Sequence, residues 1–389
     1  MNLVYLDHSA TTPVDPKVVE AMYLFLTSEF YNPSSVYAKA QNVRQHVEKS
    51  RESVARLIGA QLNEIVFTSG GTEADNMAIM GTVYANPKKG KHIITSAIEH
   101  HAVLDTCLFL EKQGYELTVL PVNREGIVEP KTLEEAMRDD TVLVSIMHAN
   151  NEVGTIQPIK ELAAIAHKYG AIFHTDAVQT AGKIPIDVDD LGVDLLSASA
   201  HKIHGPKGVG CLYIRKGIKV QNRSIGGGQE RKRRGGTENV PGIIGFGKAA
   251  ELALERMESD QQKLENLAAK LIQGILDKIP NVRLTGHPTQ RIPGHVSISL
   301  DYIEGESVIL MLDHAGIMTS SGSACTSGSL EPSHVLLAMG YKHEEAHGSL
   351  RMTLGRDNTE EDVDYVLEML PPIVQRLREL SPIFPKGAE

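Results

Sequence analysis

One lysine lies where an apolar strand gives way to a Gly/Pro turn, and its setting suits covalent chemistry. Lys202 follows a strand predicted over residues 194–197, and Asp176 follows another predicted over residues 171–174. A lysine amine can form a Schiff base with an aldehyde, and an aspartate can hold a protonated pyridine nitrogen. The two together are what pyridoxal phosphate chemistry requires. Either one alone is more often just a polar residue that ends a buried strand.

Glycine or polar residues also follow three other predicted strands. They are Gly71 and Thr72 after residues 65–68, His100 after residues 92–95, and Asn151 after residues 142–147. The glycine-rich turn opens a helix, whose free N–H groups suit a phosphate. In a parallel sheet, ligands bind outside the carboxyl ends of the strands. The five strand ends therefore predict one shared site.

Cofactor chemistry assigns a role to each of these groups. Lys202 would hold the aldehyde carbon and transfer protons, while Asp176 would keep the pyridine nitrogen protonated. His100 would stack on the ring and assist acid–base steps. The remaining expected contacts are Gln179 to the ring hydroxyl, and Gly71, Thr72, Ser199 and His201 to the phosphate.

Cys325 stands among small polar residues, from 320 to 329, where a thiol would be accessible as a nucleophile. Taken alone, an incidental loop thiol is an equally good interpretation. Cys107 lies in an apolar helix predicted near residues 103–112, and Cys211 lies in a strand, so both are expected to be buried packing residues.

Arg351 lies on a short apolar strand, where its guanidinium could hold a substrate carboxylate through two hydrogen bonds. A surface or interface salt bridge is the alternative for this residue.

Composition sets limits on function and location. The chain has 389 residues, 41% of them hydrophobic, and a net charge of −10, which does not favour binding to nucleic acid or to an anionic membrane. No apolar run is long enough to span a bilayer, and the first residues lack the pattern of a signal peptide. The three cysteines have no metal-ligand spacing, so we expect no metal site and a cytoplasmic protein. The basic residues 231–234 are expected to form a solvated loop or a subunit contact.

Strands alternate with amphipathic helices from about residue 60 to 215, which predicts an α/β fold with a mostly parallel sheet covered on both faces. A long helix is predicted over residues 245–279, interrupted near residues 258–260. A strand over residues 296–300 and a helix over residues 360–377 then predict a smaller α+β domain. We assign residues 14–255 to the large domain, and residues 1–13 and 256–389 to the small domain that carries Cys325.

A series of motifs, in order along the chain, points to one family. They are YLDHSATTP at 5–13, NPSS at 32–35, TSGGTE at 68–73, NNE at 150–152, DAVQ at 176–179, HK at 201–202, GGTEN at 235–239 and SGSAC at 321–325. On these motifs the chain resembles, essentially end to end, the cysteine desulfurases of the NifS/IscS group. That group lies within the class V, fold type I, pyridoxal phosphate-dependent aminotransferases.

The resemblance implies a large domain with a seven-stranded sheet and a smaller α+β domain. It implies that sulfur is taken from L-cysteine, leaving L-alanine and a persulfide on Cys325. It also implies a homodimer in which Thr237 of one subunit reaches the cofactor phosphate of the other. Asn151, which also contacts the cofactor, and Arg351 would bind the substrate carboxylate, with Asn32 close by. The persulfide sulfur would pass to an iron–sulfur cluster scaffold or another acceptor protein.

Two alternatives stay open. One is another class V activity, such as that of an aminotransferase or a selenocysteine lyase. Cys325 disfavours an aminotransferase, which needs no nucleophilic thiol, but it does not distinguish a selenocysteine lyase from a cysteine desulfurase. A non-catalytic assembly protein on the same fold is disfavoured because Lys202, Asp176 and Cys325 are all present.

Overall fold

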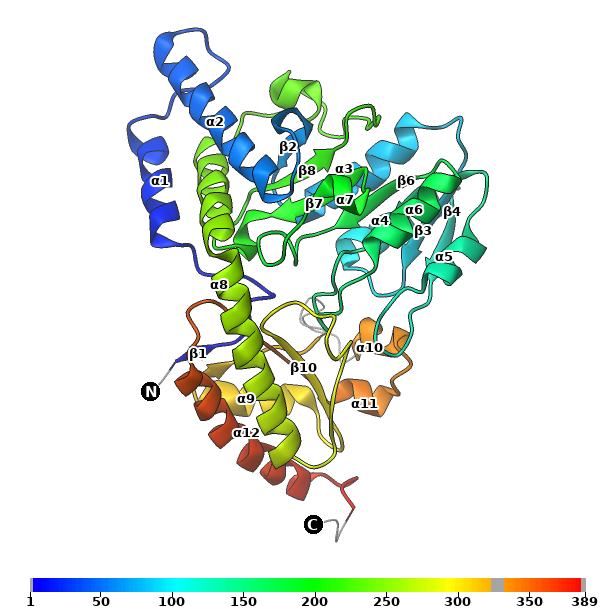
Figure 1. Cartoon of the computed structure of the whole chain (residues 1–389), viewed down its shortest axis with the longest axis vertical. Helices are drawn as coiled ribbons and strands as arrows, with labels where there is room; N and C mark the ends of the chain where they lie inside the picture. Colours follow the sequence, from blue (N-terminus) through cyan, green and yellow to red (C-terminus); the bar gives the residue numbers. More distant parts are fainter. Residues whose placement is uncertain (1–2, 323–331, 386–389) are drawn as a thin grey trace.

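A seven-stranded sheet forms the centre of the larger lobe of the molecule (Figure 1). The computed structural model describes residues 3–322 and 332–385. In spatial order the strands are β2 (Ile65–Thr68), β8 (Gly210–Ile214), β7 (Leu195–Ser199), β6 (Ile172–Asp176), β5 (Thr141–Ser145), β3 (His92–Ser96) and β4 (Glu116–Leu120). Only β8 runs antiparallel to its neighbours. The predicted mostly parallel sheet is confirmed.

Helices cover this sheet on both faces (Figure 1). They are α1 (Pro16–Thr27), α2 (Ala38–Leu57), α3 (Gly71–Ala85), α4 (His101–Lys112), α5 (Pro130–Ala136), α6 (Ile159–Lys168) and α7 (Val188–Leu191), with short 3-10 turns η1 (Leu62–Glu64), η2 (Ala200–Lys202) and η3 (Gln229–Lys232). Strands that are covered on both faces must be apolar along their whole length, and the central strands are buried at almost every position.

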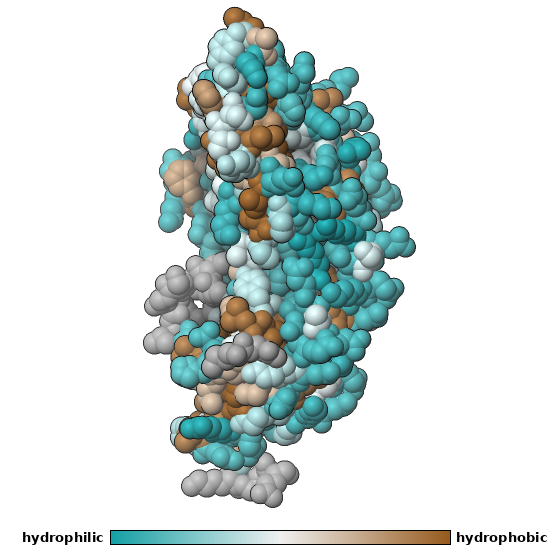
Figure 2. Space-filling model, turned by 90° about the vertical axis from the view of Figure 1, so that its left-hand side faces the viewer, coloured by the Kyte–Doolittle hydropathy of each residue, from teal (hydrophilic) through white to brown (hydrophobic). Residues whose placement is uncertain are grey.

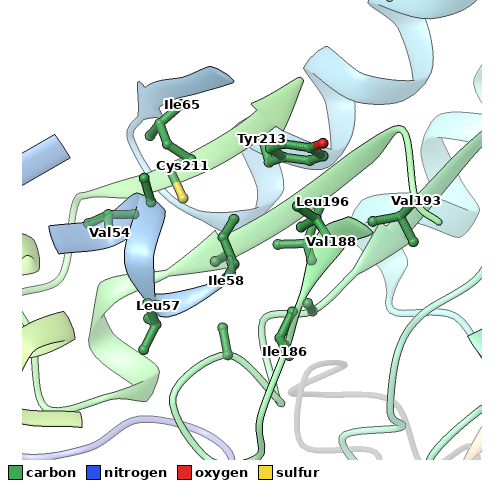
Figure 3. Packing of buried hydrophobic residues seen from close by; sticks show 14 of the residues in the cluster. Val54, Leu57, Ile58, Ile65, Ile186, Val188, Val193, Leu196, Cys211 and Tyr213 are labelled. Atoms are coloured by element: carbon green, nitrogen blue, oxygen red, sulfur yellow. The ribbon is translucent and has the colours of Figure 1, made fainter. Parts of the chain in front are cut away.

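The core under α2 shows how the sheet is held (Figure 3). Val54 and Leu57 of α2 belong to one buried cluster with Ile65 of β2 and with Cys211 and Tyr213 of β8. Each of these side chains is almost completely excluded from solvent. Burying a large apolar side chain stabilises the fold by about 1.5–3 kcal/mol. This packing fixes the edge of the sheet from which the glycine-rich turn after β2 departs.

A second lobe is built around a three-stranded antiparallel sheet. Its elements are β12 (Ser349–Thr353), β10 (His295–Leu300), β9 (Val282–Leu284), α9 (Gly305–His314), α10 (His334–Ala338), α11 (His343–His347) and α12 (Glu360–Leu380). The N-terminal strand β1 (Val4–Tyr5) pairs in parallel with β11 (Ile317–Met318), and Val4 and Leu6 belong to the core of this lobe. The domain division at residues 13/14 and 255/256 stays a prediction.

The long helix α8 (Val240–Lys278) runs through both lobes (Figure 1). The interruption predicted near residues 258–260 is wrong, because the helix continues through them without a break. None of these residues is glycine or proline, and the hydroxyl of Ser259 donates to the carbonyl of Arg256 inside the helix at 2.9 Å. No helix in the described part of the chain has the length and apolar character needed to cross a membrane.

Candidate active site

The carboxyl ends of the parallel strands open into a cavity of about 910 Å³ at the edge that faces the smaller lobe. Most of the predicted site residues line it. They are Gly71, Thr72, His100, Asn151, Asp176, Gln179, Ser199, His201, Lys202 and Arg351. Side chains that are distant in sequence thus meet because their strands end at one edge of the sheet.

Two described residues of the predicted site, Asn32 and Thr237, do not line this cavity. Asn32 and Thr237 are exposed on the surface, and the side chain of Asn32 accepts a hydrogen bond from the amide of Ser34 at 2.9 Å. Cys325 lies outside the described residues.

Lys202 ends the turn η2, directly after β7. Its Nζ donates to the backbone carbonyls of Ser9 and, at 2.9 Å, Ala10. These two residues belong to the N-terminal segment and also line the cavity. The N-terminal segment therefore forms the wall against which the lysine amine rests, a contact that no local pattern in the sequence predicts.

Two carboxylates lie on the inner wall of the cavity. Asp176 is almost completely buried and accepts a hydrogen bond from the amide of Val178 at 2.8 Å. Burial raises its pKa, although Val178, His100 and Lys202 act in the opposite direction. Asp75 of α3 is 1% exposed, and burial and the charge of Asp176 raise its pKa well above the usual range. Neighbouring buried carboxylates resist ionising together, and of the two it is Asp176 whose charged form Lys202 favours.

Asp75 is a site-lining residue that the sequence analysis missed. A charged residue on an amphipathic helix is normally assigned to the solvent side. Here its neighbours Ala74 and Ala78 are fully buried as well, and these small residues are the one signal that this face of α3 is covered.

His100 caps the N-terminus of α4. Its Nδ1 accepts a hydrogen bond from the amide of Ala102 at 3.1 Å, so Nδ1 carries no proton and the neutral ring has its proton on Nε2. Burial lowers the pKa of His100, which keeps the ring neutral near pH 7. A neutral imidazole in this wall can stack on a flat ring and can donate or accept a proton.

A group of residues in the cavity wall fits a phosphate. The Oγ atom of Ser199 is buried without a hydrogen-bond partner among the described residues, and an orphaned buried hydroxyl indicates a missing partner. Gly71 and Thr72 begin α3, whose first amides are free to bind an anion. A side chain at Gly71 would meet Val178 at 2.8 Å, so the turn needs glycine there. His201 completes this wall, and burial lowers its pKa to about 4.

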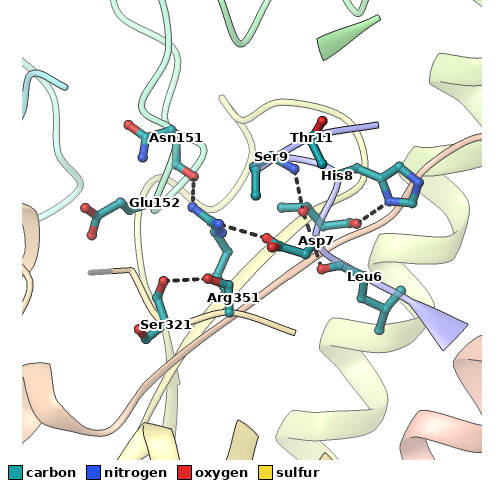
Figure 4. A network of polar contacts seen from close by, with 12 residues as sticks. Leu6, Asp7, His8, Ser9, Thr11, Asn151, Glu152, Ser321 and Arg351 are labelled. Carbon is teal, nitrogen blue, oxygen red and sulfur yellow. Dashed lines mark hydrogen bonds and ion pairs between the residues drawn. The ribbon is translucent and has the colours of Figure 1, made fainter. Parts of the chain in front are cut away.

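The part of the cavity wall at Arg351 fits a carboxylate, and Figure 4 shows the contacts of this residue. Arg351 of β12 is 3% exposed, donates to the backbone carbonyl of Asn151 at 3.0 Å and forms an ion pair with Asp7 at 2.8 Å. Its Nε has no hydrogen-bond partner among the described residues. A buried guanidinium with an unused donor beside a cavity suits an anionic group that binds there.

The two described cysteines are packing residues, as predicted. Cys107 and Cys211 are fully buried, and burial raises the pKa of each thiol to about 12. Neither is therefore a thiolate near neutral pH.

The described residues on both sides of 323–331 lie against Glu152, the neighbour of the cavity-lining Asn151. The Ser333 hydroxyl donates to the Glu152 carboxylate, and a side chain at Gly322 would clash with the same carboxylate.

The expectation of a solvated basic loop is wrong for part of residues 231–234. Arg234 is partly buried and forms an ion pair at 2.9 Å with Glu73, in the first turn of α3. Arg233 is also partly buried and donates to the backbone carbonyl of Ile65 at 3.1 Å. Acceptors at the start of α3 and of β2 draw these side chains inward, which a run of charges in the sequence does not reveal.

Comparison with known proteins agrees with this geometry. The Aminotransferase class-V family profile matches residues 4–366. Cysteine desulfurase IscS of Methanosarcina thermophila is 58% identical over 383 residues, which are 98% of this chain and 95% of the relative. The solved structure of a NifS-like protein has a TM-score of 0.91 at 40% identity, covering 97% of this chain and 100% of that chain. The structure of SspA in complex with cysteine has a TM-score of 0.81 at 35% identity, with 92% and 100% covered.

The fold and the family match together show that the chain belongs to the class V aminotransferase family. Within that family the chain belongs to the cysteine desulfurases of the NifS/IscS group. The resemblance seen in the sequence motifs is confirmed.

Proposed function

We propose that this protein removes sulfur from L-cysteine, giving L-alanine and a persulfide on Cys325, with pyridoxal phosphate as cofactor. The observation that carries the proposal is one cavity that holds a lysine amine and two kinds of anion site. Lys202 lines it together with Ser199, whose hydroxyl has no hydrogen-bond partner among the described residues, and with Arg351, whose Nε has none there either. Relatives named cysteine desulfurase and a neighbour solved with cysteine support the choice of substrate.

The cofactor would be held by groups already described. Gly71, Thr72, Ser199 and His201 would bind its phosphate. Asp176 would bind the ring nitrogen, Gln179 the ring hydroxyl, and His100 would stack on the ring face. When bound, pyridoxal phosphate supplies an electron sink that stabilises a carbanion at the carbon bearing the amino group.

Side chains of the protein would bind the substrate and transfer its protons. Arg351, with Asn151, would bind the substrate carboxylate, and Asn32 is proposed to lie close to the substrate. Lys202 would remove the proton from the substrate α-carbon and return a proton to the product. His100 would assist these proton transfers.

The Cys325 thiolate would then attack the substrate sulfur. A new S–S bond forms on Cys325 as the C–S bond of the substrate breaks, and the electron pair stays with the carbon that becomes the methyl group of L-alanine. The products, L-alanine and one enzyme persulfide, balance one L-cysteine and one enzyme thiol. A thiol reductant would release the sulfur as sulfide and restore the Cys325 thiol.

We further propose a homodimer in which Thr237 acts on the partner subunit. Thr237 is exposed and lies outside its own cavity, so a contact with the cofactor phosphate requires a second copy. Exposed apolar side chains on α1 and in the segment after it favour a surface that the second subunit covers. They are Tyr23, Leu24, Leu26, Phe30, Val36 and Tyr37, each more than half exposed. Apolar residues are also visible among polar ones on the upper part of the face in Figure 2.

The persulfide sulfur would pass to an acceptor protein, such as an iron–sulfur cluster scaffold, in the cytoplasm. The net charge of −10 does not favour nucleic acid as a partner.

The first test measures alanine formed from L-cysteine by the purified protein with pyridoxal phosphate and a thiol reductant. The matched variant is Cys325→Ala, which removes only the proposed nucleophile. We expect alanine from the wild type and essentially none from the variant. Equal alanine from both proteins would move the nucleophile elsewhere, and none from either would refute the activity.

A further inference from the structure

A second cavity lies on the opposite side of Lys202 and Ser9 from the active site. These two residues line both cavities and so form a common wall. The room inside it for water-sized groups is about 70 Å³, and the space not filled by atoms is about 800 Å³ when open solvent at its mouth is included. It lies between the middle of α8, the N-terminal segment and the turns at residues 292–295 and 353–356. Nothing in the proposed reaction uses it.

One wall of this cavity is apolar. The side chains come from α8 and from the smaller lobe: Leu252, Ala253, Met257, Leu264, Ile292 and Leu354. Several of them are buried in the interface between the two lobes. Such a wall suits the hydrocarbon part of a small molecule.

The polar lining of the cavity has an excess of positive charge. Four cationic side chains line it, Lys183, Lys202, Arg256 and Arg356, against the two acidic side chains Asp15 and Asp260.

Asp15 is already engaged, because it pairs with Arg256 at 3.0 Å and with Arg356 at 2.8 Å. Burial raises the pKa of Asp260, while Arg356, Arg256 and Lys263 act in the opposite direction. The histidines His8, His204 and His295 are neutral near pH 7, because burial lowers the pKa of each.

Lys183 is the cation that this lining leaves without a counter-ion. Among the described residues, its Nζ makes one long hydrogen bond, to Oε1 of Gln179 at 3.4 Å. Across the described parts of the chain, no carboxylate lies within ion-pair distance of it. Burial, together with the charges of Lys202 and Arg351, lowers the pKa of Lys183 to about 7. An anion beside Lys183 would supply the missing counter-charge.

We propose that this cavity is a second ligand site, which binds a short-chain monocarboxylate with its carboxylate on Lys183 and its tail on Leu252, Met257 and Leu264. A single unpaired cation beside an apolar wall favours one negative charge with a hydrocarbon tail over a phosphate. Because Lys183 also contacts Gln179 in the active-site wall, occupancy of this cavity is linked to the proposed cofactor site. The proposal does not depend on the desulfurase activity.

The test uses butyrate as the probe and thermal unfolding of the full-length protein as the readout. We expect butyrate to raise the unfolding temperature in a saturable way, because a ligand that binds only the folded state stabilises it. In Lys183→Gln the apparent dissociation constant should increase at least about ten-fold, since a charge-assisted hydrogen bond is lost. Lys88→Gln, which changes an exposed lysine, is the matched control and should respond like the wild type.

Two further variants decide between sites. Butyrate could also bind Arg351 in the active site, so Arg351→Gln should keep the stabilisation if the proposal holds. Met257→Trp, which fills the apolar side of the second cavity, should remove it. The proposal is overturned if Lys183→Gln and Met257→Trp both respond like the wild type, if Arg351→Gln abolishes the effect, or if butyrate up to tens of millimolar stabilises nothing.

Discussion

Arg351 and Asp7 form an ion pair of 2.8 Å between the guanidinium Nη2 and the carboxylate Oδ1, beside the active-site cavity. The two residues come from opposite ends of the chain. Asp7 is placed by a bridge to Thr353, two residues beyond Arg351 on β12. The pair fixes the plane of the guanidinium, and Nε, which has no hydrogen-bond partner among the described residues, would be available to the proposed substrate.

We expect Asp7→Asn to weaken substrate binding more than it slows the chemistry. The amide still fills the space but no longer holds the guanidinium by charge. The KM for L-cysteine should rise about ten-fold, with a smaller loss in kcat, because a charged hydrogen bond that orients the binding group is weakened. Steady-state kinetics of alanine formation measure both constants. An unchanged KM would show that Asp7 does not position Arg351.

Ser199→Ala should reduce cofactor affinity without reducing the stability of the cofactor-free protein. The Ser199 hydroxyl has no hydrogen-bond partner among the described residues, so its removal leaves no protein group unpaired. Loss of one hydrogen bond to a phosphate should weaken pyridoxal phosphate binding about ten-fold. Titration of the cofactor-free protein, followed by absorbance, measures the affinity, and urea unfolding measures stability. Ser197→Ala is the contrasting variant, because the Ser197 hydroxyl bonds to His174 at 3.0 Å and its loss should destabilise the fold.

Mixing two impaired variants, assayed at a cofactor concentration that leaves the Thr237→Ala protein largely unloaded, tests whether Thr237 acts across the subunits. Thr237→Ala should weaken cofactor retention, and Lys202→Ala should abolish the reaction. In a mixed dimer, one site would combine Lys202 of the first variant with Thr237 of the second. Co-expression should therefore restore about half of the activity per mixed dimer if the contact crosses the interface. Failure to restore activity, with mixed dimers present, would place Thr237 at its own subunit's site or at none.

The sequence predicted the strand ends well and the N-terminal wall poorly. Lys202, Asp176 and Ser199 follow buried apolar strands, and the rule that ligands bind at carboxyl ends of parallel strands places them together. Ser9 and Ala10 were present only in a matched motif. Their contact with Lys202 depends on pairing of the N-terminal segment with residues more than three hundred positions away, which no local pattern encodes.

The errors have physical causes as well. The polar residues around Ser259 predicted a break in α8, but none of residues 258–260 is glycine or proline, and the helix continues through them. Asp75 was overlooked because burial of a carboxylate is costly and therefore rare, and it is found mainly at sites that need it.

Glu99 gives a prediction about stability and pH. Its side chain is fully buried, and its Oε1 accepts from the Ser96 hydroxyl at 2.6 Å and from the Met147 amide at 2.9 Å. Burial raises the pKa of Glu99 from 4.5 to about 8. The folded state therefore binds more protons than the unfolded state between these values. The stability that this group contributes is present below about pH 4.5 and is lost as the pH rises toward 8.

Glu99→Gln should flatten this decline, because the amide stays neutral and its oxygen can still accept from the Met147 amide. Between pH 5 and pH 8 the free energy of unfolding of the wild type should fall relative to that of the variant by at least about 1 kcal/mol. Urea unfolding at the two pH values measures the difference. Glu111→Gln, on the exposed side of α4, is the control and should follow the wild type. If Glu99→Gln also follows the wild type, Glu99 does not titrate in this range, and its carboxyl is stabilised as a charge by groups other than those described.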